Sequence, residues 1–427
     1  MHVLLIAYEF PPSPSPQSLR WAYLSRHLAA RGHRVTVLTI HLGGRAIGLP
    51  DIPPSIGVHR TYAGPVRGTL AALRDRKSRR QAPSRLDAAG GGEASRHSGH
   101  GWKQALSDGL QGLAAKVVFP DVRGEWFPWA RRRLLSLLET DRPDVAISSH
   151  EPATTLELGL MARERGVPWI ADLGDPVLAS YTPARWRRRS FRLEQAVCRQ
   201  ADHIIVTTPT AAGLLADRHQ RHERVSVLTQ GFESATGFDG TAPSIDFDPG
   251  RLELLYTGSF YSFRRPDELL RALAAHPGVR LNVAAVTVPE ELLEAARRLP
   301  SQVRLLGFLP HRRALQLQRG ADVLVNIGNQ DPAQVPGKIY EYLGSGRPIL
   351  HLGTDDDAIS RLIGQLKRGW NCENHAAAVS RWMEDTAQAK TDGSLDQGLD
   401  LTGDRIAEYS WERLASRLEA IAQSLLR

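Results

Sequence analysis

One segment of the chain combines residue types that bind phosphate. Residues 334–350 contain Pro336, followed by Lys338 and Glu341. Proline suits the first position of a helix, where the first amides have no partner within the helix and, with the positive end of the helix dipole, form an anion site. Lys338 would add a full charge there, and Glu341 would lie one turn on, on the same face. The residues alone favour this phosphate site and an ordinary capped helix equally.

Polar residues also follow several apolar runs that are typical of buried strands. The run at 2–8 precedes a loop from Glu9 to Ser18, the run at 144–148 ends in His150, and the run at 168–171 is followed by Asp172. Ligands of parallel sheets bind at the carboxyl ends of strands. We therefore expect these side chains to lie at one edge of a sheet. A histidine in the core is the alternative interpretation for His150.

Strand and helix patterns alternate along almost the whole chain. The first half opens with a strand, a helix at 19–30 and a strand at 35–40, and later strands are expected at 203–207 and 225–228. After a polar linker at 233–250, the alternation resumes at 252–257 and continues through strands at 279–286, 303–306, 323–327 and 348–352. Gly344 and Gly346 are expected to end the helix before the last of these strands. This pattern predicts two doubly wound α/β domains with one cleft between them.

We expect an N-terminal domain at 1–240, a C-terminal domain at 250–405 and a final helix at 406–427 that packs on the first domain. Residues 67–101 are rich in Arg, Gly and Ser, which predicts a mobile surface insertion. A basic helix at 185–199 contains Trp186. Its more ordinary role is to cover the sheet, and its alternative role is contact with an anionic membrane surface.

Composition limits the class of protein. The 427 residues have a formal net charge of +8, which suits a partner that carries phosphates. Two cysteines, Cys198 and Cys372, do not make a disulfide framework and favour a reducing compartment. The N-terminal apolar run is too short for a signal peptide, and no run is long enough to span a bilayer. We expect a cytoplasmic protein, with the inner face of the cell membrane as a place of contact.

Several motifs resemble those of the GT-B fold glycosyltransferases, in particular the retaining family-4 group. The resemblance covers almost the whole chain outside 67–101. In the first half it depends on Pro11-Pro12, Gly32-His33-Arg34-Val35, His150-Glu151-Pro152, residues 201–206 and residues 227–231. In the second half it depends on Tyr256-Thr257-Gly258-Ser259 followed by Arg264-Arg265, and on Lys338 to Pro348 with its Lys-x-x-Glu-Tyr-Leu form.

The resemblance implies transfer of a sugar from a nucleotide-sugar to a glycan or lipid-linked acceptor, as in cell-surface polysaccharide assembly. Cationic side chains and helix N-termini would neutralise the departing diphosphate without a metal, and no cofactor beyond the donor substrate is expected. The implied donor-binding residues are Gly258, Arg264, Arg265, Lys338, Ile339 and Glu341. Arg264 is favoured within its pair because it stands where the family has a lysine, and a pair of surface arginines is the alternative.

The family also implies roles for the remaining residues. Glu341 matches a glutamate that resembles a ribose-hydroxyl acceptor, and we assign it with His150 to the catalytic set. His150 would contact the transferred sugar, while Glu9, Ser13 and Asp172 would lie on the acceptor side. Three positions depart from the family pattern: Ala333, with Asp331 nearby, replaces a glutamate; Ser259 replaces an arginine; and Ser13 begins a segment where the family has two glycines.

Two other functions are compatible with these residues. A nucleotide-sugar epimerase of related fold would convert a donor without any acceptor. A non-catalytic nucleotide-sugar-binding subunit would explain the departures at Ala333 and Ser259. Nucleic-acid binding is disfavoured because the sequence has no aromatic and basic platform. The run Asp355-Asp356-Asp357 lacks other ligand types nearby, so we interpret it as a loop that caps the next helix and not as a metal site.

Overall fold

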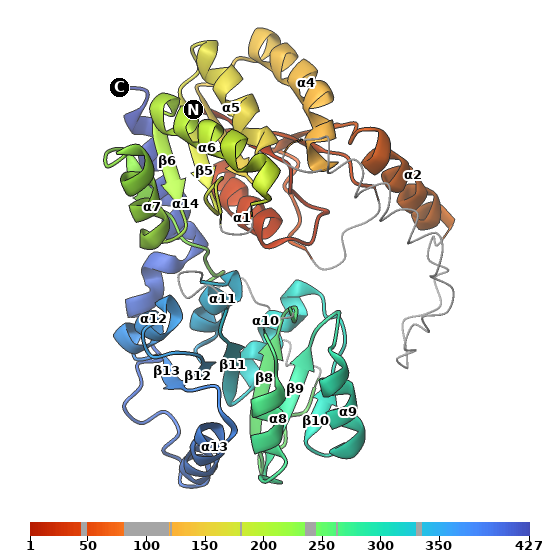
Figure 1. Cartoon of the computed structure of the whole chain (residues 1–427), viewed down its shortest axis with the longest axis vertical. Coiled ribbons are helices and arrows are strands. Elements are labelled where there is room, and N and C mark those ends of the chain that lie inside the picture. The colour runs from red at the N-terminus through yellow and green to blue at the C-terminus, as the bar shows by residue number, and fades with distance from the viewer. Residues whose placement is uncertain are drawn as a thin grey trace. The chain divides into compact units, whose positions relative to one another are not determined.

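The structure, a computed structural model, describes residues 1–43, 49–80, 119, 122–179, 182–234, 245–261, 264–329 and 335–427. The chain divides into two compact units (Figure 1). Unit 1 comprises Met1–Leu228 together with Ala415–Arg427, and unit 2 comprises Thr229–Leu414. Unit 1 is therefore made from two separate stretches of the chain.

Unit 1 contains a seven-stranded parallel sheet in the order β3-β2-β1-β4-β5-β6-β7. The order reverses between β1 and β4, which makes their carboxyl ends the switch point where such sheets bind ligands. The strands are β1 His2–Ala7, β2 Arg34–Ile40, β3 Gly57–Thr61, β4 Val145–His150, β5 Trp169–Leu173, β6 His203–Val206 and β7 Val225–Val227.

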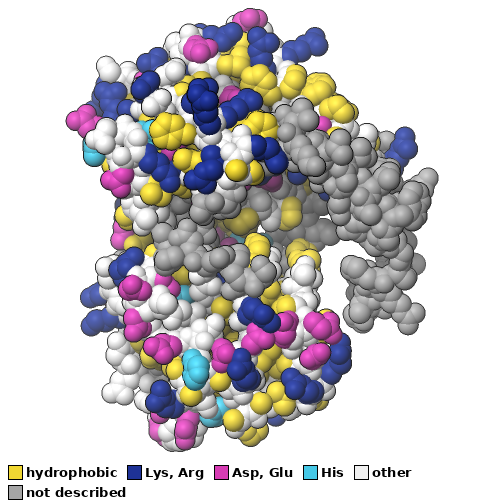
Figure 2. All heavy atoms as spheres, in the orientation of Figure 1, with side chains coloured by type: hydrophobic (Ala, Val, Ile, Leu, Met, Phe, Trp, Pro, Cys, Tyr) yellow, Lys and Arg dark blue, Asp and Glu magenta, His cyan; other side chains and the backbone are white. Residues whose placement is uncertain are grey.

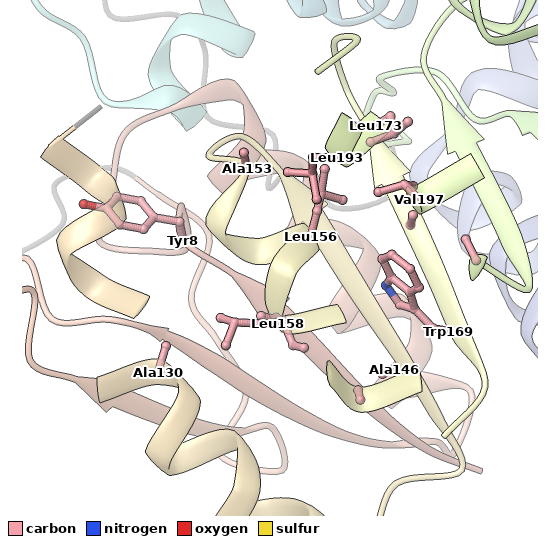
Figure 3. Packing of buried hydrophobic residues seen from close by; sticks show 14 of the residues in the cluster. Tyr8, Ala130, Ala146, Ala153, Leu156, Leu158, Trp169, Leu173, Leu193 and Val197 are labelled. Carbon is pink, nitrogen blue, oxygen red and sulfur yellow. The ribbon is translucent and has the colours of Figure 1, made fainter. Parts of the chain in front are cut away.

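Helices connect and cover these strands because their apolar faces have no other place to be buried. Leu156 and Leu158 of α5 and Leu193 and Val197 of α6 belong to one core cluster with Trp169 of β5 (Figure 3). The helices are α1 Pro16–Ala30, α2 Pro65–Arg80, α4 Phe127–Thr140, α5 Thr154–Glu164, α6 Ala184–Gln200 and α7 Pro209–His219, with a short 3-10 helix, η1, at Val122–Trp126.

Unit 2 contains a six-stranded parallel sheet in the order β10-β9-β8-β11-β12-β13. Its order reverses between β8 and β11. The strands are β8 Leu252–Thr257, β9 Val279–Ala284, β10 Val303–Leu305, β11 Val323–Ile327, β12 Ile349–Leu352 and β13 Gly369–Cys372. The helices are α8 Asp267–Leu273, α9 Glu290–Arg298, α10 His311–Gly320, α11 Gly337–Ser345, α12 Ala358–Leu366 and α13 Ala376–Thr391, followed by the 3-10 helix η3 at Asp404–Tyr409.

The last helix, α14, runs from Trp411 to Ser424. Its part from Ala415 onward belongs to unit 1, where Glu419 Oε2 accepts a hydrogen bond from Arg31 Nε at 2.5 Å and Glu419 Oε1 lies 2.6 Å from His33 Nε2. Arg417 also donates to the carbonyl oxygen of Val227 at 2.8 Å. The end of the chain is thus attached to the beginning.

The predicted pair of parallel α/β sheets is confirmed, and the structure adds elements that the sequence did not predict. β3 and β13 were not predicted, because each is an edge strand without a continuous apolar run. Part of the predicted mobile insertion is the helix α2, whose first amides, those of Val66 and Arg67, donate to the Glu125 carboxylate at 3.0 and 2.7 Å. Residues 81–101 lie outside the described residues. No helix in the described part of the chain is long and apolar enough to cross a bilayer.

Candidate functional site

The predicted phosphate-binding helix is present as α11, with a shifted start. Pro336 precedes the helix with a ψ of 141°, and Gly337 is its first residue. Gly344 lies inside the helix, and Gly346, with a φ of 72°, ends it. The start differs from the prediction because Pro336 has an extended conformation, which places Lys338 still in the first turn.

The amino group of Lys338 is held against aromatic rings. Its Nζ atom lies 3.8 Å from the ring centroid of Tyr256 and 5.8 Å from that of Tyr342. The residue as a whole is half-buried, but Nζ itself is inaccessible and has no hydrogen-bond partner among the described residues. Burial, assisted by the nearby Arg264, holds the pKa of Lys338 well below its usual value, against the opposing effect of Glu341. A buried cation without an acceptor is expensive, so an arriving anion would bind here favourably.

Arg264 lies close to the same group. Its Nε donates to Asn329 Oδ1 at 2.9 Å, and its Nη2 donates to the same oxygen. It also interacts with the hydroxyl of Tyr256, although burial is the larger effect and raises the pKa of that tyrosine to about 12. Arg264 is 8% exposed, so its charge is partly shielded from water. Arg264 and Lys338 therefore meet at Tyr256, as expected for two cations of one site.

Arg265 is not part of this group. Its side chain is 63% exposed and forms surface ion pairs with Asp267 at 3.1 Å and Glu291 at 2.9 Å. Ile339 also does not offer a binding group: its side chain is fully buried in the core, and its amide donates to the carbonyl oxygen of Pro336 at 3.0 Å. The polar groups of both residues have partners elsewhere in this structure, and their assignment to donor binding stays a prediction.

Gly258 brings backbone close to Lys338 at the carboxyl end of β8. Its φ is +112°, a conformation that side chains disfavour, and a Cβ there would lie 3.7 Å from Lys338 Cδ. Asn329 follows β11, the neighbouring strand across the switch point. The group of Gly258, Arg264, Asn329 and Lys338 is therefore built where doubly wound sheets bind ligands.

Glu341 forms a pair with His311, a residue that sequence reasoning did not select. Glu341 Oε1 lies 2.9 Å from His311 Nε2. Burial alone would raise the pKa of Glu341, but the charge and hydrogen bond of His311 lower it below the usual value. Burial alone would lower the pKa of His311, and Glu341 raises it instead. The pair keeps Glu341 ionised, which suits a hydroxyl acceptor.

A second set of residues is built in unit 1 around His150. The side chain is 5% exposed, and Nδ1 lies 2.9 Å from the carbonyl oxygen of Asp175, which fixes Nδ1 as the donor. Burial lowers the pKa of His150, against the opposing effects of Glu151 and Asp175. The residue lines a pocket of about 210 Å³ together with Arg123, Glu151, Val177, Trp186 and Ser190, among others. A neutral imidazole at the end of β4 whose Nδ1 carries the proton can accept one hydrogen bond from a ligand through Nε2.

Asp172 does not line this pocket. It is 0% exposed and forms a buried ion pair with Arg20 at 3.2 Å. Gln17 connects this pair to the site, since its Nε2 donates to Ser149 Oγ at 2.8 Å and to the carbonyl oxygen of His150 at 2.9 Å. In this structure Asp172 holds the end of β4 in place through Gln17 and Ser149, and its predicted contact with the acceptor stays a prediction.

Glu9 and Ser13 are close neighbours in the loop after β1. The hydroxyl of Ser13 donates to Glu9 Oε2, and Ser13 is 8% exposed. Of the departures from the family pattern, Asp331 and Ala333 lie outside the described residues. The carbonyl oxygen of Ser259 accepts a hydrogen bond from Tyr256 at 3.0 Å. The acceptor-side role of Glu9 and Ser13 stays a prediction.

The acidic run at 355–357 behaves as a cap. Asp357 Oδ1 accepts from the amides of Ile359 and Ser360 at 2.8 Å, and Oδ2 lies 2.8 Å from His351 Nε2. Burial would raise the pKa of Asp357, but these hydrogen bonds lower it. Across the described ranges, no three His, Cys, Asp or Glu side chains gather closely enough to hold a metal ion. The run stabilises the start of α12.

Comparison with known proteins places the chain in a family. A family model described as a glycosyl transferase 4-like domain matches residues 17–231, just over half of the chain. The chain belongs to this family. A D-inositol 3-phosphate glycosyltransferase of Mycobacterium sp. strain KMS is 28% identical over 144 residues, which are 31% of this chain and 33% of the relative. Its counterpart in Mycobacterium marinum is 24% identical over 242 residues, which are 53% of this chain and 51% of the relative. The chain thus spans a third to a half of the length of these curated relatives.

Solved structures agree on the fold. HepE of Anabaena in complex with UDP is 14% identical, with a TM-score of 0.61 over 99% of this chain and 100% of that chain. WaaG, a glycosyltransferase involved in lipopolysaccharide biosynthesis, is 16% identical, with a TM-score of 0.55 over 99% of this chain and 98% of that chain. A Listeria monocytogenes protein named as a UDP-N-acetylglucosamine 2-epimerase is 12% identical, with a TM-score of 0.55 over 99% of this chain and 96% of that chain. The predicted GT-B fold is confirmed, and this fold is shared by two classes of activity.

Proposed function

We propose that this protein is a glycosyltransferase that uses a nucleoside diphosphate sugar as donor. The observation that carries the proposal is the buried amino group of Lys338, which has no hydrogen-bond acceptor among the described residues and lies in the first turn of α11. Departure of a diphosphate requires positive charge at the leaving group, and preorganised cations supply it. Lys338 and Arg264 supply that charge, and Gly258 lets the donor approach the backbone. The family membership supports the same reaction.

The donor side of the proposal divides the roles among the residues of unit 2. Lys338 and Arg264 bind the diphosphate, and Glu341, kept ionised by His311, accepts hydrogen bonds from the ribose. We propose that no metal takes part, because the two cations with the helix N-terminus match the charge of a diphosphate. The complex of HepE with UDP makes UDP-sugars the first donors to test.

The acceptor side is proposed for the pocket of unit 1. His150 contacts the transferred sugar, Glu9 and Ser13 contact the acceptor, and the sugar keeps its anomeric configuration. The acceptor is a glycan or a lipid-linked glycan of the cell surface. The names of the mycobacterial relatives add inositol phosphate to the acceptors worth testing.

Contact with the inner face of the cell membrane is part of the proposal. The side chains of Arg185, Arg187 and Arg188 on α6 are exposed, whereas Trp186 is half-buried and its ring lies 5.4 Å from that of Phe119. On the face shown in Figure 2, basic side chains are spread over both units among acidic ones. The contact would therefore depend on arginine charge and not on an inserted tryptophan.

Release of nucleoside diphosphate tests the reaction directly. The full-length protein is incubated with UDP- and GDP-sugars, with and without glycan, lipid-linked or inositol phosphate acceptors. Acceptor-dependent release that persists in EDTA supports the proposal, and the anomeric proton of the product reports retention. Conversion of a donor in the absence of any acceptor would contradict the proposal and indicate an epimerase. Donor binding without turnover across the whole panel would replace it with a non-catalytic binding subunit.

Membrane contact is tested separately by sedimentation with phosphatidylglycerol and phosphatidylcholine vesicles. We expect binding to the anionic vesicles only, and weaker binding when Arg185, Arg187 and Arg188 are replaced by Gln. Equal sedimentation with both lipids, or no effect of the three replacements, would remove the membrane from the proposal.

A further inference from the structure

Unit 2 contains a second pocket that the donor site does not use. Its volume is about 650 Å³, within the range of sites for small organic ligands. Its walls come from the end of α11, from the loops that precede β12 and β13, from η3 and from the start of α14. All of its described lining residues belong to unit 2.

The lining of this pocket is strongly basic. The described part of the wall includes four arginines, Arg319, Arg347, Arg368 and Arg413, against one acidic residue, Glu412. The acidic group that influences the pKa of Arg368 is Asp400, which already pairs with Arg405 at 3.1 Å. The four arginines come from separate elements, so the fold and not a single basic run brings them together.

Arg368 is the residue that indicates a ligand. It is 0% exposed, yet it lines the pocket. Its Nη2 donates to the carbonyl oxygen of Thr402, while Nε and Nη1 have no hydrogen-bond partner among the described residues. A buried guanidinium with unmatched donors costs free energy until an acceptor is supplied. Phosphate oxygens match this arrangement, because one guanidinium can donate two parallel hydrogen bonds to them.

The arginines also have a purely structural explanation, which covers only part of the observations. Arg319 lies in the last turn of α10, and Arg347 and Arg368 follow α11 and α12, where positive charge balances the helix dipole. Arg347 Nε donates to the carbonyl oxygen of Arg319 at 2.7 Å in this way. Capping does not explain the two unmatched donors of Arg368, nor why Arg413 of α14 lines the same pocket.

This pocket is separate from the donor site. Lys338 lies in the first turn of α11, whereas the pocket is lined by Gly344, Ser345 and Gly346 at its end. Six to eight residues separate Lys338 from these positions, which places the two about 9–12 Å apart along the helix axis. Figure 1 shows α11 beside the sheet of unit 2. The two sites thus lie at opposite edges of that sheet: the donor site follows β8 and β11, and the pocket precedes β12 and β13.

We propose that this arginine pocket is a second anion site, which binds the phosphate group of an organic phosphate. Arg368 donates from the base of the pocket, and Arg319, Arg347 and Arg413 surround the ligand. The phosphate belongs either to a free metabolite or to a lipid headgroup, since both present the same oxygens.

Binding of inorganic pyrophosphate and of glucose 1-phosphate tests the proposal. Isothermal titration is carried out with the full-length protein and with Arg347→Gln/Arg413→Gln, which leaves the buried Arg368 in place and so limits the risk of misfolding. A matched control is Arg271→Gln/Arg297→Gln, which removes two exposed arginines of unit 2 that pair with Glu268 and Glu290. Lys338→Ala separates this pocket from the donor site. Vesicles of phosphatidylglycerol, compared with phosphatidylcholine, test the lipid source.

We expect at least one of the phosphates to bind at least tenfold more weakly to the pocket variant, and unchanged to the control. That binding should persist in Lys338→Ala. Loss of vesicle binding alone in the pocket variant would assign the phosphate to a lipid headgroup. Equal affinity of all variants for every probe, or no binding of any probe by the unaltered protein, would overturn the proposal. The arginines would then have only the structural role of stabilising helix ends. A Lys338→Ala variant that loses all phosphate binding would overturn it as well.

Discussion

The Nζ atom of Lys338 lies 3.8 Å from the ring centroid of Tyr256 and makes no hydrogen bond with the described residues. An ammonium group over an aromatic face gains about 0.5–2 kcal/mol. A charge-assisted hydrogen bond to a phosphate contributes about 1.5–3 kcal/mol, and an ammonium group has three donors for such bonds. The ring therefore holds the amino group in the absence of donor without competing strongly for it.

Replacement of this lysine tests the donor site. We expect Lys338→Ala to lower sugar transfer by about 10²–10³-fold, the usual effect of removing one preorganised donor from a developing charge. Transfer is measured as nucleoside diphosphate release. Lys367→Ala, at an exposed position of the same unit, is the control and should leave the rate unchanged. Turnover by Lys338→Ala at the rate of the unaltered protein would show that the donor phosphates bind elsewhere.

Two helical glycines of unit 1 should respond in opposite directions to the same change. A Cβ at Gly159 of α5 would meet the indole of Trp169 and lie 2.7 Å from Ser148 Oγ, whereas a Cβ at Gly213 of α7 would have nothing within 4 Å. We expect Gly159→Ala to destabilise the protein by about 1–3 kcal/mol through overpacking. Gly213→Ala should stabilise it by about 0.5–1 kcal/mol.

Urea denaturation of the two glycine variants, followed by circular dichroism, measures both effects. Each variant serves as the control of the other, because both add one methyl group to a helix. A stabilising Gly159→Ala would mean that the indole of Trp169 is free to move aside.

Removal of one partner of the buried ion pair of Arg20 and Asp172 should destabilise the protein more than replacement of both by apolar residues. Both side chains are 0% exposed, so Arg20→Met leaves an uncompensated carboxylate and should cost about 3–5 kcal/mol. The double change Arg20→Met/Asp172→Leu should recover part of this loss. Arg31 forms an ion pair with Glu419, but its side chain is 39% exposed. Arg31→Ala should therefore lower the free energy of unfolding by no more than about 1 kcal/mol.

Chemical denaturation of these variants at pH 7 gives the comparison between the buried and the exposed pair. Similar losses for Arg20→Met and Arg31→Ala would contradict the burial argument. His150 adds a second readout: because Gln17 connects Asp172 and His150, we expect Arg20→Met to lower the rate of transfer even at temperatures where the protein is fully folded.

The pair of His311 and Glu341 predicts a pH dependence of stability. The pKa of His311 is raised above its usual 6.5, so its contribution is complete below pH 6.5 and is lost as the pH rises through the folded-state pKa. The pKa of Glu341 is lowered below its usual 4.5, so its contribution is complete above pH 4.5 and is lost as the pH falls through the folded-state pKa. The pair should therefore stabilise most between these two values.

His311→Gln isolates this contribution, because glutamine can keep the hydrogen bond without titrating. The difference in melting temperature between the unaltered protein and the variant should be largest near pH 5–6 and decrease toward pH 8. His276→Gln is the comparison, because the ring of His276 lies 2.7 Å from the hydroxyl oxygen of Ser380, and this variant should show no such trend. A difference that grows toward pH 8 would contradict the assignment.

The sequence was sufficient where the physical signal is local. β1 and β11 are fully buried strands without a polar interruption other than His2 and Asn326, so their apolar runs were readily recognised. The sequence did not predict an element whose start depends on a residue that is distant along the chain. α2 begins at a carboxylate supplied by Glu125, and nothing near residue 65 in the sequence indicates that partner.

The candidate site shows the same division. Lys338 was predicted as a phosphate-binding residue because the start of its helix can be recognised in the sequence. Its contact with Tyr256, however, depends on β8 and β11 being neighbours in the sheet. Arg264 and Arg265 are identical in type and adjacent, and only the structure shows that one meets Asn329 while the other pairs with Glu291. Asn329 and His311 were missed because a lone amide after a strand, or a lone imidazole at the start of a helix, has no distinctive spacing.

The attachment of α14 to the start of the chain has a consequence for synthesis on the ribosome. Leu418 and Ala422 are buried, and Glu419 pairs with Arg31 and His33, so the final residues complete a unit that was begun with the first ones. A nascent chain can assemble unit 2 while unit 1 still lacks its last helix. An early stop codon that removes only residues after Leu414 would therefore damage the half of the protein that was translated first.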